Sequence, residues 1–367
     1  MARLELKAVD KTFGAACCAK GVSLTVEPGE IVAVFGPSGS GKTVLLRMIA
    51  GMFEPDDGDI LVGGRSIVDA PPEQRGIGMA FQNFALFPHM SARDNIASGL
   101  RATGTADTAA KVTAMSRLLK IEHVLGHKPR ELSNGQKQRT ALARALIGNP
   151  EVLLLDDPLR NVDAKLRYEM RLELPSLLRR SSAAVLYVTQ DYREAMAIAD
   201  RIAVLINGRL AQVARPEEIY ARPASVAVAR LFGDPSINLA EVTPVAEQGR
   251  LTASVAGTLI RLDADGLPTN MRERCWLGVR PDDVVVTRDG GEGAIPARIV
   301  AVTPIHERAV VLLRFADGSE WLAALAPEAL EADADEDVFV RFAPDAALLF
   351  DHATGDRIGL SPRRQAA

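Results

Sequence analysis

The sequence predicts an α/β domain with a parallel sheet, followed by an all-β domain. Apolar runs alternate with helical stretches up to about residue 232, a pattern typical of a sheet with helices on both faces. Beyond residues 232–235, short β-like runs recur between turns rich in Gly, Pro and Asp, which favours a small barrel or sandwich. The 367 residues also suffice for two domains. We therefore expect a boundary near residue 235, with domains at 1–234 and 235–367.

A β-rich segment opens the first domain. Apolar or alternating runs at residues 4–9, 22–26 and 31–35 are separated by Gly and Pro, which predicts three strands. Two shorter strands are expected at residues 58–62 and 77–81.

Helical patterns then dominate residues 88–150. Within residues 109–120, helical spacing places Val112, Met115 and the pair 118–119 on one side. After residue 150, strands and helices alternate. Apolar runs predict strands at 152–155, 184–188 and 202–206, a helix is expected after residue 165, and residues 216–231 resemble a helical tail broken at Pro223.

The second domain is predicted to consist of short strands. They are expected at residues 251–255, 258–262, 275–279, 284–287, 297–302, 310–315 and 338–342.

Composition excludes some classes of protein. A net charge of −4 disfavours a nucleic-acid-binding face spread over the molecule. No window of 18 apolar residues appears, so we expect a cytosolic chain or one peripheral to a membrane partner. Cys17, Cys18 and Cys275 form no C-x-x-C pair, and we expect the adjacent two to pack as small apolar residues.

A glycine-rich loop lies between a predicted strand and a predicted helix. Its pattern is G-x-x-x-x-G-K-T, directly after residues 31–35. Glycines let backbone N–H groups approach a polyphosphate, and a helix N-terminus attracts anions. We expect Lys42 to reach the β- and γ-phosphates and the Thr43 hydroxyl to bind Mg²⁺. The alternative, a turn that only joins the two elements, is disfavoured by the correct context on both sides. The loop residues are Gly36, Pro37, Ser38, Gly39, Ser40, Gly41, Lys42 and Thr43.

Further blocks follow this loop in a fixed order. Gln82 follows a predicted strand, and Leu-Ser-Asn-Gly-Gln at 132–136 begins a predicted helix. An apolar strand then ends in two carboxylates, Asp156 and Asp157, and Gln190 follows another strand. A carboxylate beside a phosphate loop can hold Mg²⁺ or its water, whereas burying it without a partner is costly.

With these blocks in order, residues 3–232 resemble the nucleotide-binding subunits of ABC transporters. The Leu-Ser-x-Gly-Gln block is the specific part, because other phosphate-loop families lack it. Residues 82–90, 233–238, 277–281 and 350–355 further resemble the maltose-type importer branch and its C-terminal OB-type regulatory domain. The resemblance implies a P-loop NTPase domain followed by an all-β OB-like domain. The first would have a RecA-like core, a β-subdomain and a helical subdomain at about 88–150.

The resemblance also implies ATP as substrate and Mg²⁺ as cofactor. Phe13 would stack on adenine, the alternative being a core Phe. Thr43, Gln82 and Asp156 would hold the metal, and Gln82 would also orient water, the alternative being a surface glutamine. The loop after Gln82 would contact the membrane subunits.

In such transporters each ATP lies between one chain's phosphate loop and its partner's Leu-Ser-x-Gly-Gln block. Backbone N–H groups at this helix start would meet the γ-phosphate, and the alternative is an ordinary serine N-cap. The implied partners are a second ATP-binding subunit, two transmembrane permease subunits and, indirectly, an extracytoplasmic solute-binding protein, with the chain on the cytoplasmic face of the inner membrane. The block comprises Ser133, Asn134, Gly135 and Gln136.

The chain departs from the family's usual residues near the phosphates. Asp157 replaces the usual glutamate base, Gln190 the usual histidine, Asn134 a common glycine and Arg160 a frequent serine. Aspartate withdraws the carboxylate by roughly 1.5 Å, one C–C bond. A misplacement of that size can cost on the order of 10²-fold in rate.

Gln190 cannot carry a positive charge near neutral pH, unlike histidine. Gln82, Asp157 and Gln190 are the expected catalytic residues. We hypothesise a site that binds ATP well and cleaves it slowly, in an asymmetric pair with a second ATPase. A homodimer with adequate catalysis is the alternative.

The expected function is energy coupling in an importer for a small carbohydrate or polyol. Related importers carry polyamines, iron or inorganic anions. A regulatory ATP-binding protein without transport is a second class, disfavoured by the apolar residues at 84–90. A motor on nucleic acid is a third, disfavoured by the acidic charge and the 132–136 helix.

Overall fold

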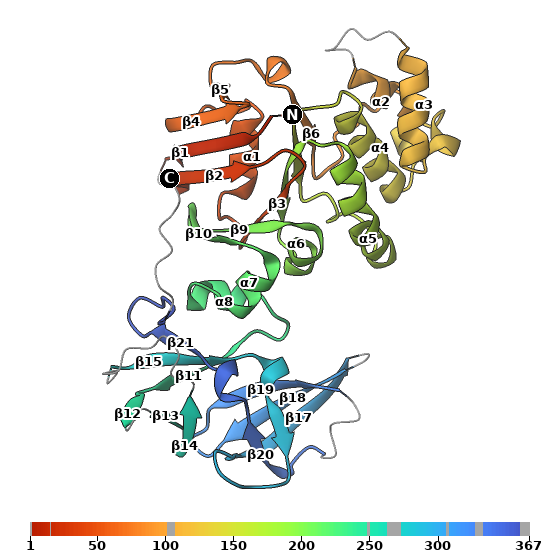
Figure 1. Cartoon of the computed structure of the whole chain (residues 1–367). Coiled ribbons are helices and arrows are strands. Elements are labelled where there is room, and N and C mark those ends of the chain that lie inside the picture. The colour runs from red at the N-terminus through yellow and green to blue at the C-terminus, as the bar shows by residue number, and fades with distance from the viewer. Residues whose placement is uncertain are drawn as a thin grey trace. The chain divides into compact units, whose positions relative to one another are not determined.

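The computed structural model describes residues 2–14, 16–100, 107–247, 250–262, 273–305, 308–326 and 333–359. Its contacts divide the chain into two compact units, Met1–Glu218 and Ile219–Ala367. Each unit has its own hydrophobic core. Figure 1 labels most of the elements of both.

A six-stranded sheet forms the centre of the first unit, with strand order β10-β9-β3-β8-β7-β6. All neighbours pair in parallel except β10, which runs antiparallel to β9. The predicted parallel sheet is therefore confirmed, with one antiparallel edge strand. Its strands are β3 (Ile31–Phe35), β6 (Ile77–Ala80), β7 (Val152–Asp156), β8 (Ala184–Thr189), β9 (Arg201–Ile206) and β10 (Arg209–Ala214).

Helices cover both faces of this sheet because alternate strand residues point in opposite directions. On one face, Ile31 and Leu153 join a core with α4 (Asn134–Leu146) and α5 (Ala164–Arg180). On the other, Val32 and Leu154 join a core with α1 (Lys42–Ile49). The helix α6 (Tyr192–Ile198) contributes Ile198 to the first of these cores.

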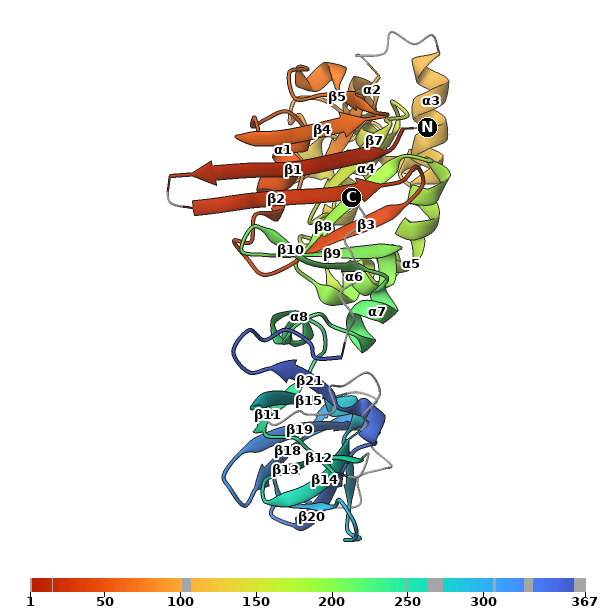
Figure 2. The ribbon, with the colours of Figure 1, turned by 60° about the vertical axis from the view of Figure 1, so that its left-hand side comes forward.

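A four-stranded antiparallel sheet packs in the same core as α1. Its order is β2-β1-β4-β5, and its two longest strands run side by side in Figure 2. These strands extend well beyond residues 4–9 and 22–26, because their cross-strand pairing continues through register shifts at residues without strict alternation. The strands are β1 (Leu4–Phe13), β2 (Ala16–Val26), β4 (Asp57–Val62) and β5 (Arg65–Ser66).

The predicted helical region contains α2 (Ala92–Ser98), α3 (Thr108–Leu118) and α4. Val112 and Leu119 are buried here as expected. Leu118 is exposed instead, because a rotation of about 100° per residue returns Leu119 to the side of Val112 but places Leu118 about 120° away from it.

The second unit begins within α7 (Pro216–Ala221) and includes α8 (Val226–Leu231). Arg280 is buried, and its guanidinium donates to the carbonyl oxygens of Tyr220 and Phe232. It also lies 3.6 Å from the Tyr220 ring centre. These contacts hold residues 220–232 in the second unit, and Phe350 packs with Ala229 of α8.

The described strands of the second unit form three antiparallel sheets, β11-β15-β21, β12-β13-β14 and β16-β20-β17-β18-β19. This confirms the predicted all-β character. The strands are β11 (Asn238–Val242), β12 (Val245–Glu247), β13 (Arg250–Val255), β14 (Thr258–Leu262), β15 (Cys275–Val279), β16 (Val285–Thr287), β17 (Ile295–Ile305), β18 (Arg308–Phe315), β19 (Glu320–Leu325), β20 (Asp337–Arg341) and β21 (Leu348–Asp351). Among the residues described, no helix combines the length and the apolar character that crossing a membrane requires.

Candidate functional site

The glycine-rich loop joins β3 to α1, as its pattern predicts. A Cβ on Gly36 would lie 2.1 Å from the carbonyl oxygen of Leu205, and one on Gly41 only 1.8 Å from that of Cys18. Gly41 also has a φ of +102°, which side chains disfavour. Close backbone approach therefore requires glycine at both positions and leaves the loop's N–H groups uncovered by side chains.

Lys42 is buried at the start of α1. Its ammonium group donates to the carbonyl oxygens of Gly36 (2.8 Å) and Pro37 (2.7 Å) and lies 3.4 Å from the Ser40 hydroxyl oxygen. Burial lowers the pKa of Lys42, while Asp157 and Asp156 oppose that effect. A cation held inside an amide-lined loop is suited to binding phosphate oxygens.

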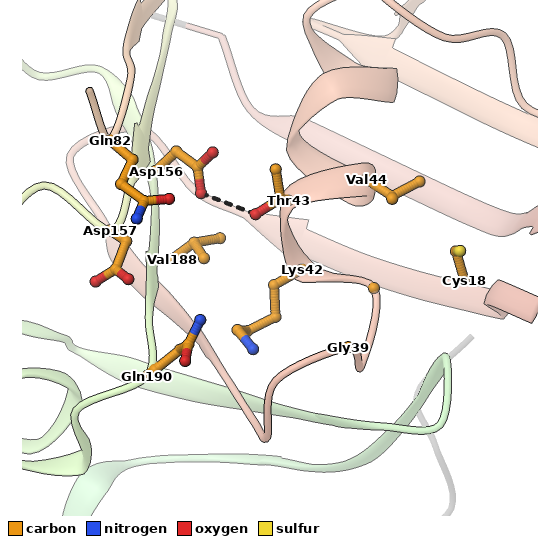
Figure 3. Close-up of a pocket in the computed structure, with 11 residues that line it drawn as sticks. Cys18, Gly39, Lys42, Thr43, Val44, Gln82, Asp156, Asp157, Val188 and Gln190 are labelled. Carbon is orange, nitrogen blue, oxygen red and sulfur yellow. Dashed lines mark hydrogen bonds between the residues drawn. The ribbon is translucent and has the colours of Figure 1, made fainter. Parts of the chain in front are cut away.

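Thr43 and Asp156 face each other across the pocket in Figure 3. The Thr43 hydroxyl donates a 3.1 Å hydrogen bond to Oδ1 of Asp156. Desolvation raises the pKa of Asp156, although this hydrogen bond, Arg47 and Lys42 counteract it. A hydroxyl beside a buried carboxylate gives the hard oxygen ligands that Mg²⁺ prefers, so these residues fit that ion.

A cavity of about 230 Å³ lies over these groups. Figure 3 shows Gln82, Asp156 and Asp157 on one side and the α1 residues opposite. The structure thus brings together eight of the predicted residues, namely Gly39, Gly41, Lys42, Thr43, Gln82, Asp156, Asp157 and Gln190. Three further lining residues, Cys18, Val44 and Val188, were not predicted.

Asp157 follows β7 in an unusual backbone conformation, with a φ of +47°. Its N–H donates to the Val188 carbonyl oxygen (2.9 Å), and its Oδ2 lies 3.5 Å from the guanidinium of Arg160. Desolvation raises the pKa of this carboxyl, and Arg160 opposes the rise most strongly. The carboxylate therefore lies in the cavity with its own cationic neighbour.

Gln190 and Gln82 each form a hydrogen bond with another loop of the site. The Ser38 hydroxyl donates to Oε1 of Gln190 (3.0 Å), and the Asn161 amide donates to the Gln82 carbonyl oxygen (2.9 Å). Gln190 thus contacts the phosphate loop, and Gln82 contacts the loop after Asp157.

The segment after Gln82 is attached to α4 through Arg144. Its guanidinium donates to the carbonyl oxygens of Ala85 (2.8 Å) and Phe84 (3.2 Å), both of which have positive φ. The same group lies 5.6 Å from the ring centre of Phe87, a side chain that is 43% exposed. This segment is therefore attached to the last turn of α4.

Three predicted groups do not line the cavity, and the first is four residues of the phosphate loop itself, namely Gly36, Pro37, Ser38 and Ser40. Phe13 is 43% exposed and packs edge-on against Phe53, with ring centres 5.2 Å apart. Ser133 caps α4, and its hydroxyl and the Gln136 side chain bond each other's backbone N–H groups. The remaining two of this block, Asn134 and Gly135, also lie outside the described cavity lining.

The cysteine interpretation was wrong for Cys17, which is exposed on β2. Its neighbour Cys18 is partly buried and reaches the cavity. Successive strand residues point to opposite faces, so only one of the two can contact the cavity. The sequence motif around Gly41 does not show which strand runs beside the loop, so it could not identify Cys18 as a cavity residue.

Comparisons with known proteins agree with this geometry. The ABC transporter family model matches residues 19–160, and the TOBE domain model matches residues 277–350. The sn-glycerol-3-phosphate import ATP-binding protein UgpC of Roseobacter denitrificans is 40% identical over 98% of this chain and 100% of its own. The maltose/maltodextrin import ATP-binding protein MalK of Yersinia pestis is 39% identical over 82% of this chain and 78% of its own.

A solved structure shares the fold of the first part of the chain. The ATP-binding cassette MJ0796, a dimer in a post-hydrolysis state with ADP and Pi, is 29% identical and has a TM-score of 0.53. The match covers 58% of this chain and 98% of MJ0796. The chain therefore belongs to the ABC transporter ATP-binding proteins, a family of ATPases, and carries a P-loop ATPase domain followed by an OB-type TOBE domain.

Proposed function

We propose that this chain is the energy-coupling subunit of an importer for a small carbohydrate, a polyol or a polyol phosphate. The observation that carries this proposal is the similarity to two import ATP-binding proteins, over 98% of this chain for that of sn-glycerol-3-phosphate and over 82% for that of maltose/maltodextrin. The cavity over Lys42, Thr43 and Asp156 supports ATP as the driving ligand. The remaining alternatives, another imported solute or a regulatory protein without transport, lack a supporting feature of this kind.

Each residue of the site has a defined role in this proposal. The loop N–H groups and Lys42 bind the β- and γ-phosphates, Phe13 stacks on the adenine, and Thr43, Asp156 and Gln82 hold Mg²⁺. When bound, Mg²⁺ neutralises charge on the β- and γ-phosphate oxygens. Asp157 accepts the proton of the attacking water, since a base must lie within hydrogen-bond reach of it.

The second half of the site comes from a facing protomer. The exposed N-terminus of α4, with Ser133 as its cap, is suited to meeting a γ-phosphate from outside the chain. Charge neutralisation from both sides is what phosphoryl transfer requires. We therefore place ATP between two copies or two related subunits.

The departures at Asp157 and Gln190 support an asymmetric version of this pair. A shorter base and a neutral amide weaken hydrolysis while leaving the phosphate-binding groups intact. We propose that this chain hydrolyses ATP slowly alone and pairs with a second, more active ATPase subunit. Turnover of the purified chain should be compared with that of a mixture with its neighbour-encoded homologue. Rapid turnover by the chain alone would favour the homodimer instead.

The membrane partners are two permease subunits, contacted through residues 84–90. Phe87 is exposed there, and Arg144 holds the segment in place. We place the chain peripherally on the cytoplasmic face of the inner membrane, with the solute-binding protein on the other side. The C-terminal domain, proposed as residues 235–367, would assist dimer formation and regulation.

Reconstitution tests the transport function. The chain, its adjacent permeases and the solute-binding protein would be assembled in proteoliposomes, with uptake of radiolabelled sn-glycerol-3-phosphate and maltose measured with and without internal ATP. ATP-dependent uptake of either solute is the expected result. ATP binding without copurification of a permease, and without uptake, would favour the regulatory alternative.

A further inference from the structure

We propose that Arg160 is a positioning residue for hydrolysis, which orients the carboxylate of Asp157 within the cavity. The two residues stand in one short loop, and Nη1 of Arg160 lies 3.5 Å from Oδ2 of Asp157. Both are departures from the family's usual residues, so the contact joins two of these departures. The inference rests on the proposed role of Asp157 as the base.

The backbone of Asp157 is fixed, but its short side chain needs a partner to fix its direction. A φ of +47° and the hydrogen bond to Val188 set where the side chain leaves the main chain. The carboxylate is almost fully enclosed, with the residue 7% exposed. An ion pair on one carboxylate oxygen restricts rotation and leaves the second oxygen able to accept a proton.

Hydrogen bonds fix the backbone of Arg160, which sets the point from which its side chain reaches Asp157. Its N–H donates to the Asp157 carbonyl oxygen (3.3 Å), and its own carbonyl oxygen accepts from Arg167 (3.4 Å). Arg167 also binds the Val162 carbonyl oxygen at 3.0 Å. Arg167 therefore stabilises the turn at residues 157–162, and the Arg160 side chain points back to the Asp157 carboxylate.

The charges around Asp157 explain why a cation is useful here. Asp156 is its neighbour on β7, and Glu194 and Tyr187 interact with it from α6 and β8. Lys42 is the other cation that acts on it, but that side chain is directed to the phosphate loop. Because Gln190 is neutral, the Arg160 guanidinium supplies positive charge at the base.

The test is a double-mutant cycle on the purified full-length chain, whose turnover comes from its own site. Arg160→Ser, which introduces the family's common residue, should lower kcat about 10-fold by misplacing the base, with KM for ATP unchanged. Arg160→Lys keeps the charge and should restore most of the rate. In the Asp157→Asn background, Arg160→Ser should have no further effect, because the group that it orients is gone.

Controls separate this role from folding and from the proposed function. Arg209 is exposed on β10, so Arg209→Ser should leave kcat unchanged. All variants should bind ATP and have the melting temperature of the parent. An unchanged or higher kcat in Arg160→Ser, or additive effects with Asp157→Asn, would overturn the proposal while leaving Asp157 as the base. A normal rate in Asp157→Asn itself would overturn both.

Discussion

The hydroxyl of Ser38 donates a 3.0 Å hydrogen bond to the side-chain oxygen of Gln190, 152 positions along the chain. This contact joins the phosphate loop to the end of β8 through two neutral groups. A neutral amide can hold the loop, but it cannot add positive charge when negative charge develops on phosphate. The contact thus retains the geometry of the site without an ionisable side chain.

Restoring the family's usual residues should accelerate hydrolysis. Asp157→Glu lengthens the base, and Gln190→His adds a group able to carry charge near neutral pH. Together they should raise kcat of the purified chain on the order of 10²-fold, as steady-state phosphate release would show. Adding Lys42→Ala should abolish the gain. An unchanged kcat would mean that neither residue limits the rate.

Two glycines of the phosphate loop provide a matched pair. A Cβ on Gly41 would meet the Cys18 carbonyl oxygen at 1.8 Å, whereas one on Gly39 meets no atom within 4 Å. Gly39→Ala should therefore cost only the backbone strain of its +79° φ, about 1–3 kcal/mol. Gly41→Ala should be worse in both stability and ATP affinity, measured by denaturation and nucleotide titration. Equal effects would show that the clash relaxes freely.

Cysteine alkylation should distinguish three environments. Burial raises the pKa of Cys275 to about 12, and the thiolate is the reactive form, so this thiol should resist iodoacetamide at pH 8 in the folded protein. The exposed Cys17 should react first, and MgATP should slow the reaction at Cys18, which lines the cavity. Peptide mass spectrometry would quantify each site. Equal labelling of all three is expected only in denaturant.

The second unit should depend on Phe350, which is fully buried against Ala229, Ile237 and Leu348. Phe350→Ala should destabilise this unit by about 3–5 kcal/mol, since it leaves a cavity. Phe350→Leu, which fills more of the space, should cost less. Urea unfolding followed by the Trp276 and Trp321 fluorescence would measure both. A negligible loss in Phe350→Ala would mean that the cluster collapses around the missing ring.

Local patterns predicted much of this molecule. The strand at residues 31–35, the loop and the start of α1 are adjacent in sequence, so apolar runs and glycines sufficed. Contacts between distant strands were not predictable in this way. Cys18 reaches the cavity because β2 passes the loop. The Arg160 contact depends on a left-handed backbone conformation at Asp157, which helix and strand periodicity do not predict. Leu118 was misassigned because adjacent helix positions lie about 100° apart, so Leu118 and Leu119 cannot both face the core.

Arg144 connects the segment after Gln82 to one end of α4. Its guanidinium donates hydrogen bonds to the carbonyl oxygens of Phe84 and Ala85. Ser133 caps the opposite end of the same helix, about 16 Å away at the usual rise per residue. In the proposed transporter, a permease at Phe87 and a nucleotide at Ser133 would therefore contact opposite ends of one helix.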